Sequence, residues 1–142
     1  MKKKISKPFI IGEVGINHNG SVDLAKEIIL LAKKSNFDAV KLQKRDLNIC
    51  IPDSQKNKIR ETPWGEMTYL NYKKKIEFND KQFRHLKNYC KKIDIELFCS
   101  AFDIESLRFL KKFNFRYNKV PSALITNLNF LKEVAKQKKK TF

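Results

Sequence analysis

Four short apolar runs alternate with helix-patterned segments along this chain, and each run ends in polar residues. The runs lie at residues 9–13, 39–43, 95–100 and 117–122. The segments between them carry apolar residues at intervals of three and four, which is the period of an amphipathic helix. This order predicts an α/β fold with a parallel sheet, in which a helix connects each strand to the next.

Polar side chains stand at or near the carboxyl end of each predicted strand. In parallel α/β architectures all strand carboxyl ends point to one edge, and ligands bind at that edge. Residues far apart in the sequence are therefore expected to converge there. The predicted site residues are Glu13, Lys41, Gln43, Ser100, Lys119 and Ser122.

These side chains suit an anionic, sugar-like substrate. Lys41 and Lys119 offer ammonium groups for a phosphate and a carboxylate. Gln43 both donates to and accepts from sugar hydroxyls, whereas the serines add neutral donors. Glu13, among these cations, is expected to stay ionised and to act as a base or orient the substrate.

A structural role is the alternative for each of these residues. Lys41 and Glu13 also fit a structural salt bridge, because ion pairs occur in buried sites without catalysis. Ser100 and Ser122 also fit ordinary turn positions. His18 is compatible with a loop histidine, and His85 is expected on the surface of a lysine-rich helix.

The net charge of +16 raises the hypothesis of nucleic-acid binding. Only five of the 31 basic residues are Arg, the residue that base and bidentate phosphate recognition favour. The lysines occur in every helical segment and do not form one stripe. We therefore expect a solvated, lysine-rich surface, including the run at residues 73–75, and no nucleic-acid partner.

Composition indicates one globular domain. The chain has 142 residues, of which 42% are hydrophobic, and no apolar run approaches the roughly 18 residues of a membrane-spanning helix. The basic start at residues 1–4 lacks the long apolar region of a secretory signal. The three cysteines form no CxxC pair, so free and mostly buried thiols are expected in a cytoplasmic protein with no membrane partner.

Local signals predict where the helices begin. Ser21, Asn79, Asp103 and Asn127 each precede a helical pattern as N-cap residues, and Gln82 completes a capping box with Asn79. Residues 44–78 are expected to be a long irregular region, in which Trp64 serves as a packed anchor of an ordered loop. The last residues, 141–142, resemble the start of a fifth strand with an exposed edge.

Four motifs resemble the N-acetylneuraminate (sialic acid) synthase family. They are GEVGINHNG at 12–20, AVKLQ at 39–43, FCSAFD at 98–103 and NKVPS at 118–122. KLQKR at 41–45 together with RETPWG at 60–65 resembles a branch in which Lys-Arg follows the Gln. The resemblance runs over essentially all 142 residues.

The resemblance implies a (βα)8 barrel that condenses phosphoenolpyruvate with an N-acetylated amino sugar, such as N-acetylmannosamine, to a nonulosonic acid and phosphate. It implies that Lys41, Lys119, Ser100 and Ser122 bind phosphoenolpyruvate. Gln43 then resembles the sugar-contacting residue, and Glu13 the carboxylate at the catalytic centre. A divalent metal, Mn²⁺ or Mg²⁺, is also implied, with histidine ligands in later strands that are outside this sequence.

Some positions depart from the family pattern. Ser100 stands where many members have Thr, and Ala101 where many have Pro. Pro121, Ala123 and Leu124 replace a small residue and Gly-Glu, so the loop expected near the phosphate is altered.

A full barrel needs about 250 residues, so we expect residues 1–142 to form the N-terminal half of the barrel domain. On this interpretation the chain has about four βα units and stops at the start of strand five. The C-terminal half-barrel and an antifreeze-like domain are then absent, and the chain alone is expected to be inactive. Full-length members are expected to be homodimers. The alternatives are a Schiff-base pyruvate aldolase that uses Lys41 or Lys119 and a non-catalytic half-barrel binding module.

Overall fold

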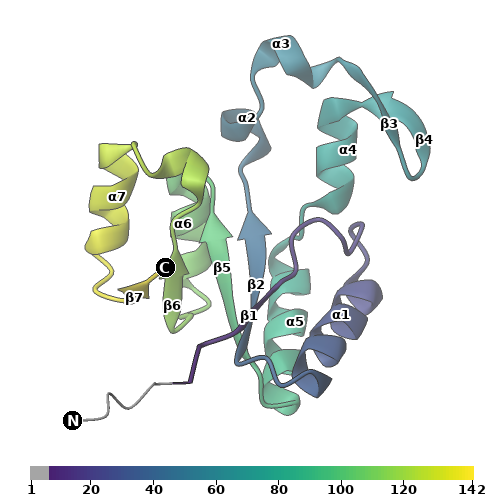
Figure 1. Cartoon of the computed structure of the whole chain (residues 1–142). Coiled ribbons are helices and arrows are strands. Elements are labelled where there is room, and N and C mark those ends of the chain that lie inside the picture. Colours follow the sequence, from purple (N-terminus) through teal and green to yellow (C-terminus); the bar gives the residue numbers. More distant parts are fainter. Residues whose placement is uncertain (1–6) are drawn as a thin grey trace.

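The computed structural model describes residues 7–142, so the basic start of the chain lies outside the described residues. A parallel five-stranded sheet with the order β1-β2-β5-β6-β7 forms its centre (Figure 1). The strands are β1 (Ile11–Glu13), β2 (Ala39–Lys44), β5 (Glu96–Ala101), β6 (Tyr117–Lys119) and β7 (Lys140–Thr141). The α/β fold with a parallel sheet is therefore confirmed, including the start of a fifth strand.

Two strand boundaries differ from the prediction by two residues or more. β1 begins at Ile11 and not at residue 9, because the Ile10 N–H donates to the Asp38 side chain and not to a neighbouring strand. β6 ends at Lys119 and not at residue 122. Pro121 has no N–H to extend the ladder, and it leads into the 3₁₀ turn η1 (Ser122–Leu124).

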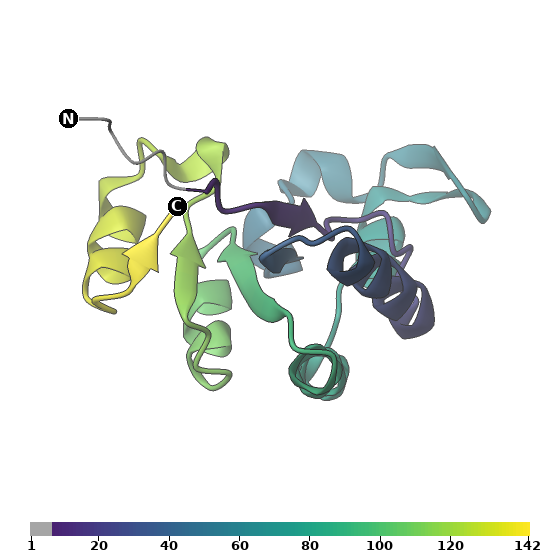
Figure 2. The same cartoon turned by 60° about the horizontal axis from the view of Figure 1, so that its bottom comes forward.

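The connecting helices lie around the outside of the curved sheet (Figure 2). They are α1 (Val22–Lys34), α5 (Asp80–Lys92), α6 (Ile104–Lys111) and α7 (Leu128–Ala135). All four predicted N-caps are confirmed: each cap side chain accepts a hydrogen bond from the backbone three residues on, and Asn79 and Gln82 form the capping box. The inner face of the sheet carries an aromatic cluster, in which Phe98 and Tyr117 lie 5.7 Å apart between ring centroids.

Residues 44–78 were expected to be irregular, but most of them form helices and strands. They contain α2 (Leu47–Cys50), α3 (Asp53–Lys56), β3 (Ile59–Thr62), β4 (Gly65–Thr68) and α4 (Tyr69–Ile76). β3 and β4 form an antiparallel hairpin that projects away from the main sheet (Figure 1). We call residues 44–78 the excursion; it leaves and returns at the carboxyl end of β2.

Trp64 is not a fully packed anchor, because it lies at the hairpin turn and is 38% exposed. Its contacts are with α4: its ring centroid lies 6.5 Å from that of Tyr72, and the Lys75 ammonium lies 4.7 Å from it. The run at residues 73–75 is likewise not uniformly solvated. Lys73 is half-buried against Tyr69 and Tyr72, whereas Lys74 and Lys75 are exposed.

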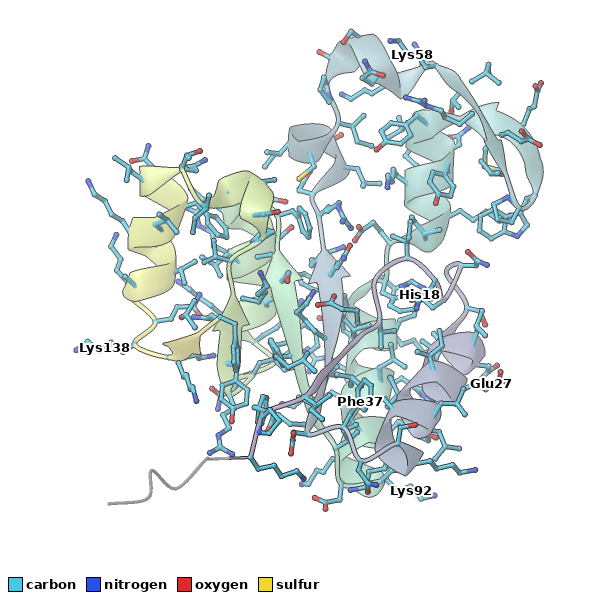
Figure 3. The ribbon with its side chains drawn as sticks, in the orientation of Figure 1. His18, Glu27, Phe37, Lys58, Lys92 and Lys138 are labelled. Carbon is cyan, nitrogen blue, oxygen red and sulfur yellow. The ribbon has the colours of Figure 1, made fainter. Side chains whose placement is uncertain are left out.

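The lysines are dispersed over the described surface, as expected. Lys58, Lys92 and Lys138 lie at three separate extremities of the molecule (Figure 3). Cys50, Cys90 and Cys99 are free thiols, and the last two are buried. Among residues 7–142, no helix is both long and apolar enough to cross a membrane.

Candidate active site at the carboxyl edge of the sheet

Strand register places five of the six predicted site residues in two rows on one face of the sheet. Gln43 pairs with Ser100, and Ser100 pairs with Lys119, so these three form a row across β2, β5 and β6. Glu13 pairs with Lys41 one pleat earlier. Because side chains two residues apart on a strand share a face, Lys41 and Gln43 join the two rows. The expected convergence is therefore present for these five residues.

Lys41 is the most buried cation of this site, with 4% of the residue exposed. Its ammonium lies 2.7 Å from a carboxylate oxygen of Glu13, whose side chain is 61% exposed. The salt bridge considered as the structural alternative therefore exists. Within the described chain, Glu13 is the one carboxylate that pairs with the Lys41 ammonium. Because this carboxylate is accessible to water, an incoming anion can compete with it for the ammonium.

Lys119 is half-buried, and its ammonium donates to the Val120 backbone carbonyl at 2.7 Å. Ser100, between Lys119 and Gln43 in the row, is 1% exposed. Ser122 lies outside the rows as the exposed first residue of η1. No hydrogen bond within the described chain joins its side chain to the other predicted residues, so only loop position associates it with the site.

Arg45 and Glu77 contact the site, although sequence reasoning did not select them. An Arg45 guanidinium nitrogen donates to the Gln43 amide oxygen. Another nitrogen of the same group lies 3.3 Å from a Glu77 carboxylate oxygen, and the Lys44 ammonium lies 3.4 Å from the other oxygen. The Lys-Arg pair after Gln43 was the only sequence signal for Arg45. Nothing local marks Glu77 as its partner.

A cavity of about 530 Å³ opens at the same edge, between the excursion and the loops after β5 and β6. Arg45, Tyr69 and Lys73 contribute its polar side, and Phe102 and Leu124 are among its apolar residues. Its lining includes none of the six predicted site residues. Arg45, whose guanidinium carbon lies 4.0 Å from the Phe102 ring centroid, lines this cavity and also contacts Gln43.

His18 is a loop histidine, as the sequence allowed, and its side chain is buried. It is 3% exposed, its Nδ1 accepts a hydrogen bond from the Gly20 N–H at 3.0 Å, and its ring stacks on Phe78 at 4.1 Å. Figure 3 shows it in the loop between β1 and α1, beside the return of the excursion. His85 is exposed, as predicted.

Burial lowers the pKa of His18 below its ordinary value of 6.5. The unfolded chain then binds a proton at a pH where the folded chain does not, so the contribution of neutral His18 is present above about pH 6.5 and is lost as the pH falls below it. We expect the wild-type urea midpoint to fall between pH 7.5 and pH 5.5 by more than that of His18→Gln. Equal falls in the two proteins would contradict this assignment.

The described residues do not fit a metal centre. No group of three or more His, Cys, Asp or Glu side chains in residues 7–142 is arranged to hold an ion. Glu13 is ion-paired with Lys41, and His18 Nδ1 is hydrogen-bonded to the backbone.

Comparisons with known proteins identify the family of this chain and several of its relatives. Residues 28–142 match the NeuB family. The chain is 36% identical over 138 residues to the N,N'-diacetyllegionaminic acid synthase of Campylobacter jejuni, covering 96% of this chain and 41% of that protein. It is 36% identical over 135 residues to the N-acetylneuraminate-9-phosphate synthase of Drosophila melanogaster, covering 94% of this chain and 36% of that protein.

Solved structures give the same result. The crystal structure of N-acetylneuraminic acid (sialic acid) synthetase from Leptospira borgpetersenii serovar Hardjo-bovis, in complex with citrate, superposes with a TM-score of 0.80 at 27% identity. The match covers 96% of this chain and 44% of that one. The chain thus spans about two fifths of the length of the curated relatives it matches. From its motifs, fold and relatives, the chain belongs to the NeuB family, which the sequence resemblance to sialic acid synthases indicated.

Proposed function

We propose that this chain supplies the phosphoenolpyruvate-binding half of a nonulosonic acid synthase active site. The observation that carries the proposal is the pair of rows in which Lys41 and Lys119 flank Gln43 and Ser100 on one face of the parallel sheet. Relatives named as sialic, legionaminic and pseudaminic acid synthases support it. The reaction condenses phosphoenolpyruvate with an N-acetylated amino sugar, such as N-acetylmannosamine, and releases phosphate.

Each residue has a role in this proposal. The ammonium groups of Lys41 and Lys119 hold the phosphate and carboxylate, and Ser100 and Ser122 add neutral donors. Gln43 contacts the sugar, and Glu13 orients the reacting groups or moves a proton. C3 of phosphoenolpyruvate attacks the sugar aldehyde carbon, a water oxygen adds at C2, and phosphate leaves from C2. The complete enzyme would also hold a divalent metal, Mn²⁺ or Mg²⁺, through residues other than these.

We also propose an architecture for the complete enzyme. Residues 1–142 form the N-terminal half of a (βα)8 barrel, and the complete enzyme is a cytoplasmic homodimer. The inner aromatic cluster supports the first point, because Phe9 and Phe142 stack on each other and pack edge-on against Tyr117, yet remain 42% and 36% exposed. Such a face is a barrel interior when further strands cover it.

The Schiff-base alternative receives less support. A lysine that attacks a carbonyl needs a neutral amine with a free lone pair. Lys41 is ion-paired with Glu13, and Lys119 donates to a backbone carbonyl, so both are used as cations or donors.

A phosphate-release assay tests the proposal. The native gene product that contains this chain, purified from its source cells with Mn²⁺ or Mg²⁺ added, is expected to release phosphate from phosphoenolpyruvate only when an N-acetylated amino sugar is present. The 142-residue chain alone is expected to release none. Phosphate release without the sugar, or none from the native product with any N-acetylated hexosamine, would contradict the proposal.

A further inference from the structure

We propose that Arg45, held by Glu77, is a positioning residue that fixes the Gln43 amide as a hydrogen-bond donor to the ligand. This rests on the proposed function only in its last step, where Gln43 contacts the sugar. The orientation itself follows from contacts within the chain. The inference concerns which atom of Gln43 faces the ligand, and therefore what the site accepts.

The chemistry of the partner determines the orientation of the amide. A guanidinium group carries only donors, so the atom of Gln43 that contacts Arg45 must be the carbonyl oxygen. The Gln43 Nε2 group then points elsewhere. It lies over Gly15, where a Cβ built on that glycine would be only 3.1 Å from it. Within the described chain Gln43 Nε2 donates no hydrogen bond and is not fully buried, so it remains available to a ligand.

Arg45 is itself held in place from two further sides. Its guanidinium carbon lies 4.0 Å from the Phe102 ring centroid. The Glu77 carboxylate accepts hydrogen bonds from the Arg45 Nη1 group and from the Arg45 backbone N–H, each at 3.3 Å. Glu77 has a side chain only 9% exposed, so this ion pair is shielded from solvent. A planar fork that contacts a carboxylate with one arm and an amide with the other cannot be reproduced by the single nitrogen of lysine.

The site therefore presents an N–H donor at the Gln43 position and takes a ligand with an acceptor oxygen there, such as an N-acyl carbonyl or a hydroxyl oxygen. A ligand that needs to donate at this point is disfavoured, because the amide oxygen is already occupied by Arg45. This is a specificity determinant carried by the Lys-Arg pair that follows Gln43.

The first test uses the ¹⁵N-labelled chain and the side-chain amide signals of Gln43, assigned by their loss in Gln43→Glu. Arg45→Lys, which keeps the charge, is expected to shift these signals and bring them toward those of a free glutamine. Arg84→Lys is the matched control, because Arg84 makes an exposed pair with Asp80 on α5. Unshifted Gln43 signals in Arg45→Lys would overturn the positioning role.

The second test measures kinetics on the native gene product. Arg45→Lys is expected to raise the KM for the sugar about three- to tenfold, the factor that corresponds to one net hydrogen bond, and to leave the KM for phosphoenolpyruvate unchanged. Equal changes in both KM values, or no change, would overturn the link to the sugar. If the wild-type product shows no condensation at all, the proposed function fails, while the amide signals still decide whether Arg45 orients Gln43.

Discussion

Replacement of Lys41 by Met is expected to lower the affinity of the native gene product for phosphoenolpyruvate about 10- to 100-fold, the loss of one charge-assisted contact. Lys41 is the most buried cation of the site, and no other cation lies in its row with Glu13. Folding is expected to survive, because Met fills a similar volume and the exposed Glu13 carboxylate regains water. The KM for phosphoenolpyruvate and the melting temperature are the measurements.

Lys87→Met is the matched control for that experiment. Lys87 lies on α5, lines a cavity with Asp94 and Asn114 near the amino ends of the strands, and donates to the Phe113 carbonyl. The Lys87→Met substitution removes the same charge, but from the opposite edge of the sheet. The interpretation of Lys41 as a ligand is wrong if both variants bind phosphoenolpyruvate equally well.

Replacement of Gly20 by Ala is expected to destabilise the fold by about 2 to 5 kcal/mol. Gly20 has a φ of +73°, and an added Cβ would stand 2.0 Å from the Lys75 carbonyl oxygen. Left-handed backbone costs about 1 to 2 kcal/mol for a residue with a side chain, and overpacking adds about 1 to 3 kcal/mol. Urea unfolding at constant m-value measures the loss.

Gly65→Ala separates the two contributions. Gly65 also has a positive φ, +89°, but an added Cβ meets nothing within 4 Å. Its substitution is expected to cost about 1 to 2 kcal/mol, from backbone conformation alone. Equal losses for the two variants would mean that the loop after β1 does not pack tightly against the end of α4.

The periodic parts of the fold could be predicted from sequence because their signals are local. Strand runs, helix periods and the four caps each depend on residues within a few positions of one another. The site rows followed from a rule about parallel sheets and not from any contact. That is why Glu13, Lys41, Gln43, Ser100 and Lys119 were expected at one edge, whereas Ser122 stays outside the rows because Pro121 ends the strand.

The remainder depends on contacts between distant residues. The hairpin of β3 and β4 has only four residues per strand and almost no buried side chains, so no alternating pattern marks it. His18 is buried because Phe78, sixty residues later, stacks on it. Arg45 meets Glu77 only because the excursion returns to the carboxyl end of β2. Such pairs become visible only once the chain is folded.

A titration of phosphoenolpyruvate into the ¹⁵N-labelled chain shows whether the carboxyl edge of the sheet binds the anionic substrate. We expect the largest shifts in the backbone amide signals at Lys41, Ser100 and Lys119, with little change at Asp94 and Asn114 at the opposite edge. Shifts centred on that opposite edge, or spread evenly over the lysine-rich helices, would contradict binding at the carboxyl edge and indicate binding by surface charge alone.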